Sequence, residues 1–296
     1  MPIRLTALTD PAAAPGARRE VWLAEEDGVP VGSAHLRTSD RDDRWHLAEL
    51  ELTVHPAERR RGTGGLLLDA AAAAARAADR SVLLAGADEG GPGEAFLAAR
   101  GLRRVLVLAA ARLPLAEADE AALTVLAERP HPGYRLVSWD GTVPDDLLDR
   151  YVAARPAMDD MPVGDTGFGA VRWDADRLRS AAAAVAARGD LLTTTAVLAD
   201  GPAGEGGGMV AFTELVVPGD GTGDAQHYGT GVLPGHRGRG LAGWMKAEQI
   251  RAVRRRHPAL AGLLTDTAEH NVPMRRVNEA LGYRPTHRTC HYRLDL

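Results

Sequence analysis

Residues 232–246, VLPGHRGRGLAGWMK, decide how this chain is read because they have a counterpart nearer the N-terminus. Residues 54–68, VHPAERRRGTGGLLL, align with them without gaps, and six of the fifteen positions are identical. The shared residues are Val, Pro, two Arg and two Gly in the same places. A repeated segment predicts that one structural unit occurs twice in the chain.

The surroundings of the two stretches agree in kind. Before residues 54–68, apolar and polar residues alternate around an Asp27-Gly28 turn, which predicts a hairpin followed by a third strand up to Val54. The Ala- and Leu-rich residues 64–79 predict a helix, because both residue types have a high helix propensity. A strand, a short helix ending at Gly101 and another strand are expected to complete the first copy.

The second copy repeats this order more fully. Helices are expected at residues 144–154, 174–188, 241–256 and 273–281, and strands at 134–139, 191–199, 209–217, 225–232, 262–268 and within 283–296. The first copy has a much shorter stretch between its first two strands, so it should lack two helices. We therefore predict an N-terminal domain at residues 1–115, a connector at 116–132 and a C-terminal domain at 133–296.

Composition narrows the class of protein. A chain of 296 residues with a net charge of -5 can bury a large core but lacks the basic surplus of a nucleic-acid binder. No apolar run is long enough to span a membrane, and the first residues lack the order of a signal peptide. The single cysteine, Cys290, excludes an internal disulfide and a cysteine-rich zinc site. We expect a cytoplasmic protein with no metal, nucleic-acid or membrane partner.

The glycine-rich repeat suits a phosphate group. A strand that leads through Arg-x-x-Gly-x-Gly/Ala into a helix presents free backbone N–H groups at the helix N-terminus. Glycines let a phosphate approach the backbone, so the loop fits a pyrophosphate. It lacks the Lys-Ser/Thr pair of a P-loop and the Gly-x-Gly-x-x-Gly spacing of a dinucleotide fold. A solvated loop without a ligand is the alternative.

The element order and the motif Val-x-Pro-x-x-Arg-x-x-Gly-x-Gly/Ala resemble the GNAT N-acetyltransferase superfamily. Asn271, Asn278, Gly282 and Tyr283 match a second feature of that family. The resemblance implies an α+β fold of two tandem GNAT-like domains, each with a mixed, largely antiparallel central sheet flanked by helices. The first copy would lack the first two helices. The tandem layout is similar to that of mycothiol synthase and other two-copy members of the family.

The resemblance also implies that the loop binds the pyrophosphate of acetyl-CoA. The residues expected to bind acetyl-CoA in the second copy are Val232, Leu233, Arg237, Gly238, Arg239, Gly240, Leu241, Ala242 and Asn271. Those expected in the first copy are Val54, Arg59, Arg60, Gly62, Thr63 and Gly64.

In the family, alternate residues of the strand before the motif face the acceptor. In the second copy these are Gln226, Tyr228 and Thr230, which are polar; in the first copy they are the apolar Ala48, Leu50 and Leu52. This difference and the missing helices predict that the C-terminal copy is catalytic and the N-terminal copy silent. The alternative for Gln226 and Tyr228 is a satisfied polar pair in a half-buried strand.

The residues that usually act as general base and general acid in the family do not occur at the expected positions of this chain. Gln226 stands where relatives often have Glu or His, and Asn278 stands where they often have a Tyr that acts as the general acid. The catalytic candidates are therefore Gln226 and Tyr228 through a bound water, Glu214 on the neighbouring strand, and Asn278. Tyr283 and His291 are further candidates, although aromatic residues at strand ends usually serve packing.

The acceptor site should lie in the extra helical insert of the second copy. Asp159, Asp160 and Trp173 belong to a stretch rich in Asp, Met and aromatic residues, which suits a cationic amine with an apolar body. The alternative is a solvated loop with ordinary helix caps.

These expectations combine into one function. The chain should transfer an acyl group, most simply acetyl from acetyl-CoA, to a primary amine of a small molecule by direct transfer in a ternary complex in the C-terminal domain. It should act as a monomer or homodimer. The alternatives are a protein N-acetyltransferase, a mycothiol-synthase-like enzyme and a non-catalytic acetyl-CoA-binding protein.

Overall fold

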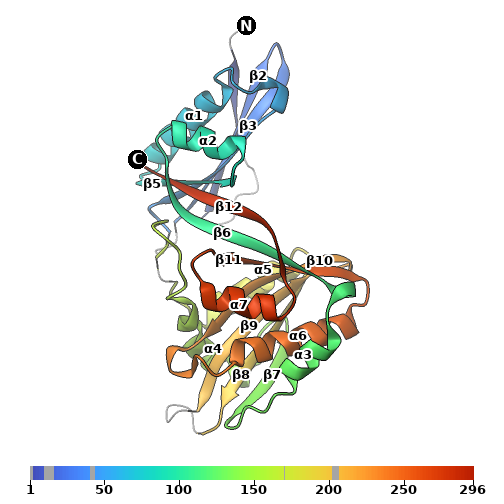
Figure 1. The fold of residues 1–296 in the computed structure, drawn as a ribbon. Helices are drawn as coiled ribbons and strands as arrows, with labels where there is room; N and C mark the ends of the chain where they lie inside the picture. Colours follow the sequence, from blue (N-terminus) through green and yellow to red (C-terminus); the bar gives the residue numbers. More distant parts are fainter. Residues whose placement is uncertain (1–2, 10–16, 41–43, 170, 202–206) are drawn as a thin grey trace. The chain divides into compact units, whose positions relative to one another are not determined.

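The computed structural model describes residues 3–9, 17–40, 44–169, 171–201 and 207–296, which form two compact units. The first unit comprises Met1–Leu108, Val163–Ala170 and Arg288–Leu296, and the second comprises Ala109–Pro162 and Val171–His287. Figure 1 follows the chain from blue to red.

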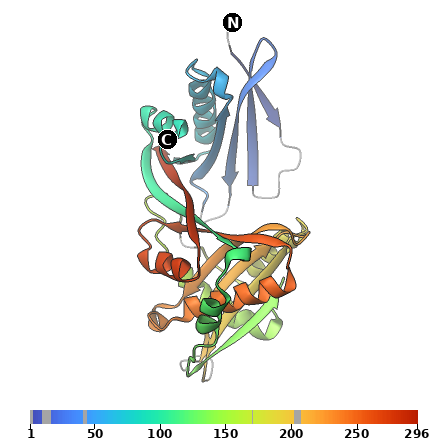
Figure 2. The same cartoon turned by 45° about the vertical axis from the view of Figure 1, so that its right-hand side comes forward.

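The first unit is a sheet with helices on one face (Figure 2). Its strands follow the order β1-β2-β3-β4-β5-β12-β6, with β6 (Arg103–Pro114) contributing residues 103–108. β1 to β4 are antiparallel neighbours, β4 and β5 are parallel, and β12 is antiparallel to β5. The elements are β1 (Arg4–Thr9), β2 (Ala17–Glu26), β3 (Val29–Ser39), β4 (Leu47–Val54), α1 (Thr63–Ala77), β5 (Val82–Asp88), α2 (Pro92–Ala99) and β12 (Arg284–Asp295), with a 3-10 turn at Pro56–Glu58.

The core of this unit lies between the sheet and α1 and α2. Leu36, Leu50 and Leu83 from the strands pack with Leu67 of α1 and Leu97 of α2, and all five are buried. The alternation of residues along β4 sends Ala48, Leu50 and their apolar neighbours to this face. The apolar residues that alternate along the predicted strands are therefore the residues that form this core.

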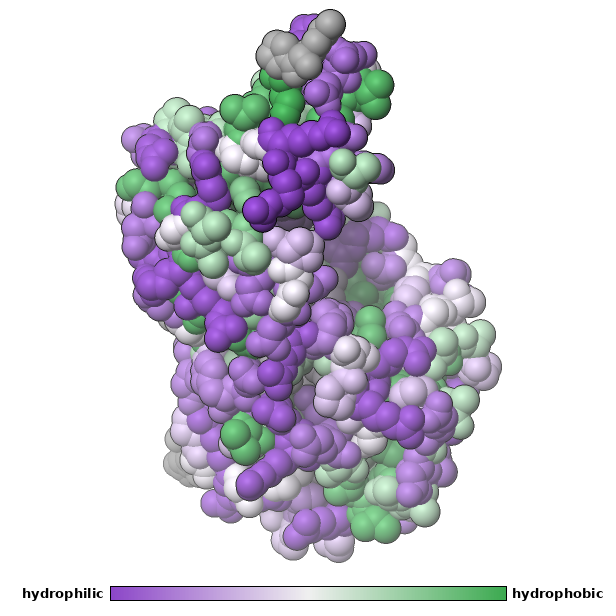
Figure 3. Space-filling view, turned by 45° about the horizontal axis from the view of Figure 1, so that its top comes forward, coloured by the Kyte–Doolittle hydropathy of each residue, from purple (hydrophilic) through white to green (hydrophobic). Residues whose placement is uncertain are grey.

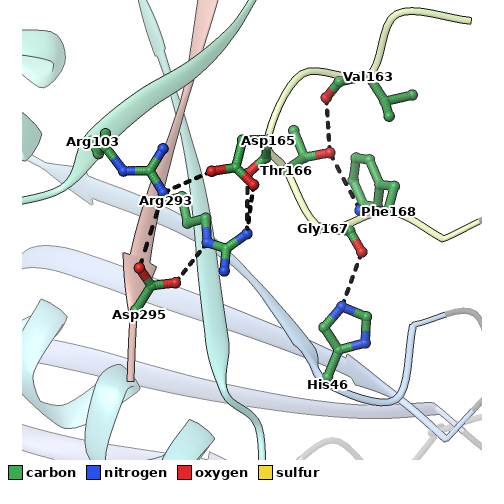
Figure 4. A network of polar contacts seen from close by, with 9 residues as sticks. All are labelled: His46, Arg103, Val163, Asp165, Thr166, Gly167, Phe168, Arg293 and Asp295. Atoms are coloured by element: carbon green, nitrogen blue, oxygen red, sulfur yellow. Dashed lines mark hydrogen bonds and ion pairs between the residues drawn. The ribbon is translucent and has the colours of Figure 1, made fainter.

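A short segment packs on the opposite face of the first unit's sheet. Phe168 lies against Leu47, Val82 and Leu84, and the guanidinium of Arg44 lies 4.8 Å above its ring. His46 donates from Nε2 to the carbonyl of Gly167 over 2.9 Å (Figure 4).

Ion pairs anchor the same segment. Asp165 pairs with Arg103 and Arg293, and Arg293 also pairs with Asp295 (Figure 4). The insert expected to form the acceptor site therefore contributes residues 163–170 to the first unit instead.

The second unit is a sheet covered on both faces. Its strand order is β6-β11-β10-β9-β8-β7, with β6 contributing residues 109–114. The elements are β6 (Arg103–Pro114), α3 (Glu120–Ala127), β7 (Tyr134–Asp140), α4 (Asp145–Ala154), α5 (Ala175–Ala186), β8 (Leu191–Ala199), β9 (Gly208–Val217), β10 (Gly223–Val232), α6 (Leu241–Arg256), β11 (Leu260–Ala268) and α7 (Val272–Ala280), with 3-10 turns at Leu115–Glu117, Arg155–Met158 and Pro234–His236.

Two cores lie on the two faces of this sheet. On one face, Leu215 of β9 packs with Leu123 of α3 and Ile250 of α6. On the other, Phe212 of β9 packs with Leu148 of α4, and α5 joins the same cluster. Figure 1 shows α3, α6 and α7 together on one side of the strands. We call the face of the sheet that α6 covers the α6 face, and the face that α4 covers the α4 face.

The mixed sheets flanked by helices confirm the predicted fold class, and each helix predicted in the second copy forms within a few residues of its expected bounds. The interval between β1 and β2 consists of residues 10–16, which lie outside the described part of the chain, so the expectation that the first copy lacks two helices there stays a prediction.

The compact units differ from the predicted sequential domains. The last strand begins in the second unit, but Arg288–Leu296 belongs to the first, where β12 pairs with β5. The boundaries at residues 115 and 133 stay a prediction about the two sequence copies.

The surface is mixed in polarity. Figure 3 shows hydrophilic residues over most of the visible face, with hydrophobic residues in small separate groups. Among the described residues, no helix is both long and apolar enough to cross a membrane.

The position of β12 generates a stability prediction. The side chain of Tyr292 is buried in the core of the first unit and its hydroxyl donates to Glu94. Tyr292→Ala should therefore destabilise this unit by about 3–5 kcal/mol, as large-to-small core substitutions do. Hydrogen exchange should accelerate in β4, β5 and α1 and stay unchanged in β8 to β10. Arg284→Ala, an exposed change on the same strand, is the control; equal acceleration in both units would contradict the assignment of β12 to the first.

Candidate functional site

The loop between β10 and α6 is shaped to expose backbone N–H groups. After the 3-10 turn, Gly238 and Gly240 have φ values of 74° and 79°, in the left-handed region that favours glycine. Gly240 is the N-cap of α6 and no side chain caps the helix there. A Cβ added at Gly238 would meet nothing within 4 Å. The first N–H groups of α6 therefore remain available to an anion, which the helix dipole favours.

The loop between β4 and α1 has the same conformation. Arg60 and Gly62 take positive φ values of 66° and 92° at the positions of Gly238 and Gly240, and Gly62 is the N-cap of α1. The first Arg of the motif also acts alike in both copies: Nε of Arg59 donates to the carbonyl of Val54, and Nε of Arg237 donates to that of Val232. The repeated sequence thus encodes a repeated backbone geometry, in which this Arg holds the loop against its strand.

Next to each loop, two parallel strands part. The parallel pairing of β10 with β11 ends at Gln226 and Leu264, although β10 continues to Val232 and β11 to Ala268. Pairing of β4 with β5 ends likewise at Leu50 and Ala85. The parted strand ends leave backbone groups without a ladder partner on that side, beside the N-terminus of the following helix. An elongated ligand with a phosphate at one end suits this arrangement.

A β-bulge distinguishes the second copy from the first. In the pairing of β10 with β9, His227 lies opposite Leu215 and Gly229 lies opposite Glu214, so Tyr228 is an extra residue. The pairing of β3 with β4 has no such shift. A bulge leaves the extra residue outside the ladder and reverses the alternation of faces beyond it.

The prediction that Gln226, Tyr228 and Thr230 share one face is therefore wrong. Gln226 lies opposite Val216, whose side chain packs with α5 on the α4 face. Thr230 lies opposite Thr213, and their hydroxyl groups are 2.8 Å apart. Thr213 alternates with Phe212 on β9, so Thr230 points to the α6 face.

The same correction applies to the first copy. Ala48, Leu50 and Leu52 all belong to the core with α1, so they do not face an acceptor site. On the opposite face, Glu49 and Glu51 pair with Arg37. Gln226 lies on the α4 face, whereas the residues of the first copy face α1, so the difference in their polarity does not separate the two copies. The bulge in β10 does separate them.

Gln226 and Tyr228 have partners of their own. Gln226 donates from Nε2 to the carbonyl of His227 over 3.1 Å and lies 3.4 Å from a carboxylate oxygen of Asp266. The hydroxyl of Tyr228 accepts a hydrogen bond from Arg188 over 2.8 Å, and the residue is 53 % exposed. The extra residue Tyr228 therefore lies at the surface.

Glu214 lies in a polar network on the α4 face. Tyr151 donates its hydroxyl to Glu214 Oε1 over 2.6 Å, and Arg155 Nη1 lies 2.9 Å from the same oxygen. Burial, and next the charge of Glu214, raise the pKa of Tyr151 well above its usual value. The other oxygen of Glu214 is directed toward the bulge, since a Cβ on Gly229 would lie 3.3 Å from Oε2. A carboxylate therefore reaches the bulge from the neighbouring strand.

The predicted acceptor residues lie in different surroundings. Trp173 stacks on the buried guanidinium of Arg155, whose carbon lies 3.7 Å from the ring centroid. Asp160 forms two hydrogen bonds with Arg237, at 2.5 Å and 2.8 Å, so this carboxylate meets the loop and not a ligand; the bonds keep the pKa of Asp160 low. Asp159 is exposed at the end of the 3-10 turn. The structure does not bring these three residues together as one pocket wall.

The 3-10 turn after α4 closes on the strand end beyond the bulge. A Cβ on Gly231 would lie 2.9 Å from the Cβ of Ala157 and 3.1 Å from the sulfur of Met158. Glycine at this position is therefore required for close packing. Together with the Asp160–Arg237 pair, this contact joins the insert to the glycine-rich loop.

A buried polar cluster lies on the α6 face behind the parted strands. Lys246 of α6 is 1 % exposed, and its Nζ donates to Asn278 Oδ1 over 2.8 Å. Asn278 in turn donates from Nδ2 to the hydroxyl of Thr267 over 3.2 Å. His227 and Tyr283 are hydrogen-bonded over 2.7 Å, and Lys246 lies 5.1 Å from the Tyr283 ring centroid.

Burial dominates the electrostatics of this cluster. It lowers the pKa of Lys246 to about 7 and raises that of Tyr283 well above its usual value. The pKa of His227 falls well below its usual value, first through burial and second through the charge of Lys246. Asn271 lies at the start of α7, where its side chain caps the helix by accepting from the N–H of Met274.

Sequence reasoning missed Lys246 and His227 as members of the site. Lys246 is the single lysine of the chain, where every other long basic side chain is Arg, and it closes the repeated segment where the first copy has Leu68. That replacement of Leu by Lys in an apolar helix was the available signal. His227 offered none, because its inward orientation depends on the bulge.

The described residues hold no group of three or more His, Cys, Asp or Glu side chains that could bind a metal ion. The predicted catalytic side chains nearest the parted strands are Gln226 on β10 itself, Glu214 on the neighbouring strand and the buried Asn278 on α7.

Comparisons with known proteins agree with this geometry. Residues 17–100 match the model of the acetyltransferase (GNAT) domain. A stretch of 143 residues, 47% of this chain, is 38% identical to mycothiol acetyltransferase of Clavibacter michiganensis subsp. michiganensis. That stretch spans 43% of the relative's length, less than half of it.

Solved structures extend the likeness over almost the whole chain. A tandem GNAT protein from the clavulanic acid biosynthesis pathway is similar with a TM-score of 0.73 and 26% identity, over 96% of this chain and 84% of that one. A GCN5-related N-acetyltransferase from Sphaerobacter thermophilus is similar in fold, with a TM-score of 0.65 and 16% identity over 94% of this chain and 80% of that one. The chain therefore has the tandem GNAT layout, with an acetyltransferase (GNAT) domain within residues 17–100.

Proposed function

We propose that the protein is an acyl-CoA-dependent N-acyltransferase that transfers acetyl from acetyl-CoA to a primary amine of a small molecule. We place the reaction in the second unit, by direct transfer in a ternary complex. The observation that carries this proposal is the combination of parted strands, bulge and glycine-rich loop at one end of β10. The first copy has the parted strands and the loop but lacks the bulge.

The glycine-rich loop is the part of this site that would hold acetyl-CoA. The N–H groups at the start of α6 would bind the pyrophosphate, as they do not have intrahelical partners and carry the positive end of the helix dipole. Arg239 is available as a helper, whereas Arg237 is already held by Asp160 and by Val232. The acyl arm would run between β10 and β11, where the strands part beyond Gln226.

The bulge supplies the chemistry that acetyl transfer needs. The amine nitrogen attacks the thioester carbonyl carbon, so negative charge develops on the carbonyl oxygen before the C–S bond breaks. Backbone N–H groups freed from the ladder at the bulge are suitable donors to that oxygen. Glu214, directed at Gly229, is suited to bind the acceptor ammonium and take its proton.

Three other functions remain candidates from the sequence. A mycothiol-synthase-like role has support from the likeness to mycothiol acetyltransferase, over less than half of that relative. A protein N-acetyltransferase would need an open groove, and the packing of Ala157 and Met158 on Gly231 disfavours one at that point. A non-catalytic acetyl-CoA-binding protein is separated from an enzyme only by turnover.

Calorimetric titration with acetyl-CoA, followed by a thiol-release assay over a panel of amines, tests the proposal. We expect saturable binding and release of free CoA with at least one small primary amine. Tight binding without turnover on any amine or peptide N-terminus would leave the non-catalytic binding protein as the function.

A matched pair of glycine substitutions tests which copy acts. Gly240→Glu adds about 1–2 kcal/mol of left-handed backbone strain and places a negative charge where the pyrophosphate should bind. We expect the KM for acetyl-CoA to rise by at least about tenfold. Gly62→Glu makes the same change at the equivalent place in the first copy and should leave kcat and KM within about twofold. Steady-state kinetics on both variants decide; the reverse pattern would assign the reaction to the first copy.

Glu214→Gln tests the base. Loss of a general base typically lowers the rate by about 100-fold, so kcat should fall by that order while acetyl-CoA binding by calorimetry is retained. Because this change leaves buried Arg155 without its carboxylate, the double variant Arg155→Met/Glu214→Gln is measured beside it, with thermal unfolding of each. Glu248→Gln, on the surface of α6, is the control. Unchanged kcat in a folded Glu214→Gln variant would remove Glu214 from the mechanism.

A further inference from the structure

We propose that Lys246 is a positioning residue of the C-terminal site, which holds Asn278 so that the second side-chain N–H of Asn278 stabilises the departing CoA thiolate. This inference rests on the function proposed above and adds the fate of the leaving group to it. When the amine nitrogen forms its bond to the carbonyl carbon and the C–S bond breaks, the electron pair of that bond passes to sulfur. The proton lost by the amine goes to Glu214 and then to solvent, so the thiolate needs a hydrogen-bond donor.

The hydrogen bonds of Asn278 define which way its amide points. Oδ1 accepts from Lys246 Nζ, so Nδ2 is on the other side, where it donates to Thr267. An amide nitrogen has two N–H groups, and the bond to Thr267 uses one. With methionine or leucine in place of Lys246, nothing in this contact would stop the amide from turning its oxygen toward Thr267.

Thr267 locates this amide at the parted strands. The pairing of β11 with β10 ends at Leu264, and Thr267 lies three residues further along β11. Thr267 is buried, as is Asn278. The chain of hydrogen bonds from Lys246 through Asn278 therefore ends on the stretch of β11 beside which the acyl arm would run.

The energetic cost of Lys246 also favours a functional role. Burying an amine beside an amide and an aromatic ring, with no carboxylate partner among the residues that the structure describes, is unfavourable compared with an apolar side chain of similar length. The titratable groups that face Lys246 are His227 from β10 and Tyr283, which follows α7. With a pKa near 7, the amine holds its proton part of the time at neutral pH, and the ammonium form polarises Asn278 more strongly.

The single lysine makes a direct test available. Labelling with lysine carrying 13C at Cε gives one signal in the full-length protein, provided that any purification tag lacks lysine. We expect this signal to titrate near pH 7 in the free protein and to move on addition of CoA, with a raised pKa because a nearby thiolate favours the ammonium form. Desulfo-CoA, which binds through the same pyrophosphate but has no sulfur, should leave the pKa of Lys246 as in the free protein.

The outcomes are separable. Equal responses to CoA and desulfo-CoA, with both ligands shown by calorimetry to bind, would overturn the role of Lys246 and leave the proposed function intact. Absence of CoA binding to the wild-type protein would instead overturn the proposed function and this inference with it.

Kinetics on two variants separate positioning from a purely structural role. Lys246→Met removes the donor to Asn278, and we expect kcat to fall by about 100-fold, the size of effect seen when a preorganised donor is lost, with the KM for acetyl-CoA nearly unchanged. Lys246→Gln keeps an N–H donor and should recover part of kcat. Arg255→Met, on the exposed end of α6, is the control. Wild-type kcat in Lys246→Met would contradict the inference.

Stability should move in the opposite direction to activity. Because the folded pKa of Lys246 is lowered from 10.5 to about 7, the unfolded chain binds a proton that the folded chain lacks between these values. Burial of the ammonium form therefore destabilises the folded wild type most at pH values below about 7, and this cost is relieved as the pH rises toward 10.5. The free energy of unfolding of the wild type should rise with pH across this window for that reason. Denaturant unfolding should show this rise with pH lost in Lys246→Met, which should be at least as stable as wild type at pH 7.

Discussion

The parting of β10 from β11 after Gln226 is the constraint on which the candidate site depends. Two parallel strands that stop pairing leave backbone donors and acceptors that must find other partners. In the second unit this opening lies next to the uncapped N-terminus of α6, and the helix supplies aligned N–H groups at the same end of the sheet. The opening, the loop and the helix end together can serve one elongated anionic ligand, whereas none of them could do so alone.

The two copies share a loop, and one extra residue in β10 distinguishes the strands that lead into it. Their glycine-rich loops repeat the same left-handed positions and the same hydrogen bond from an arginine to the preceding strand. The extra residue Tyr228 then changes which side chains reach each face of β10, bringing His227 inward and Gln226 to the α4 face. Since side chains alternate with a period of two, one inserted residue is enough to rearrange the whole site.

Opposite faces of β10 carry different polar chemistry. On the α4 face, Glu214 is held by Tyr151 and Arg155 and is directed at the bulge. On the α6 face, Lys246 and Asn278 form a buried chain to β11. A transfer reaction needs a proton acceptor near the amine and a donor near the leaving group, and the two candidate groups lie on opposite faces of β10.

The sequence by itself determined the element types, the repeat and the loop conformation, because helix propensity, alternation and glycine positions act over short distances. It could not determine the faces of β10, since the bulge is set by pairing with β9 and leaves no local signal. It also could not show that Phe168, Asp165 and Arg288–Leu296 pack in the first unit. Those contacts join residues that are far apart in the sequence, so only the tertiary structure decided them.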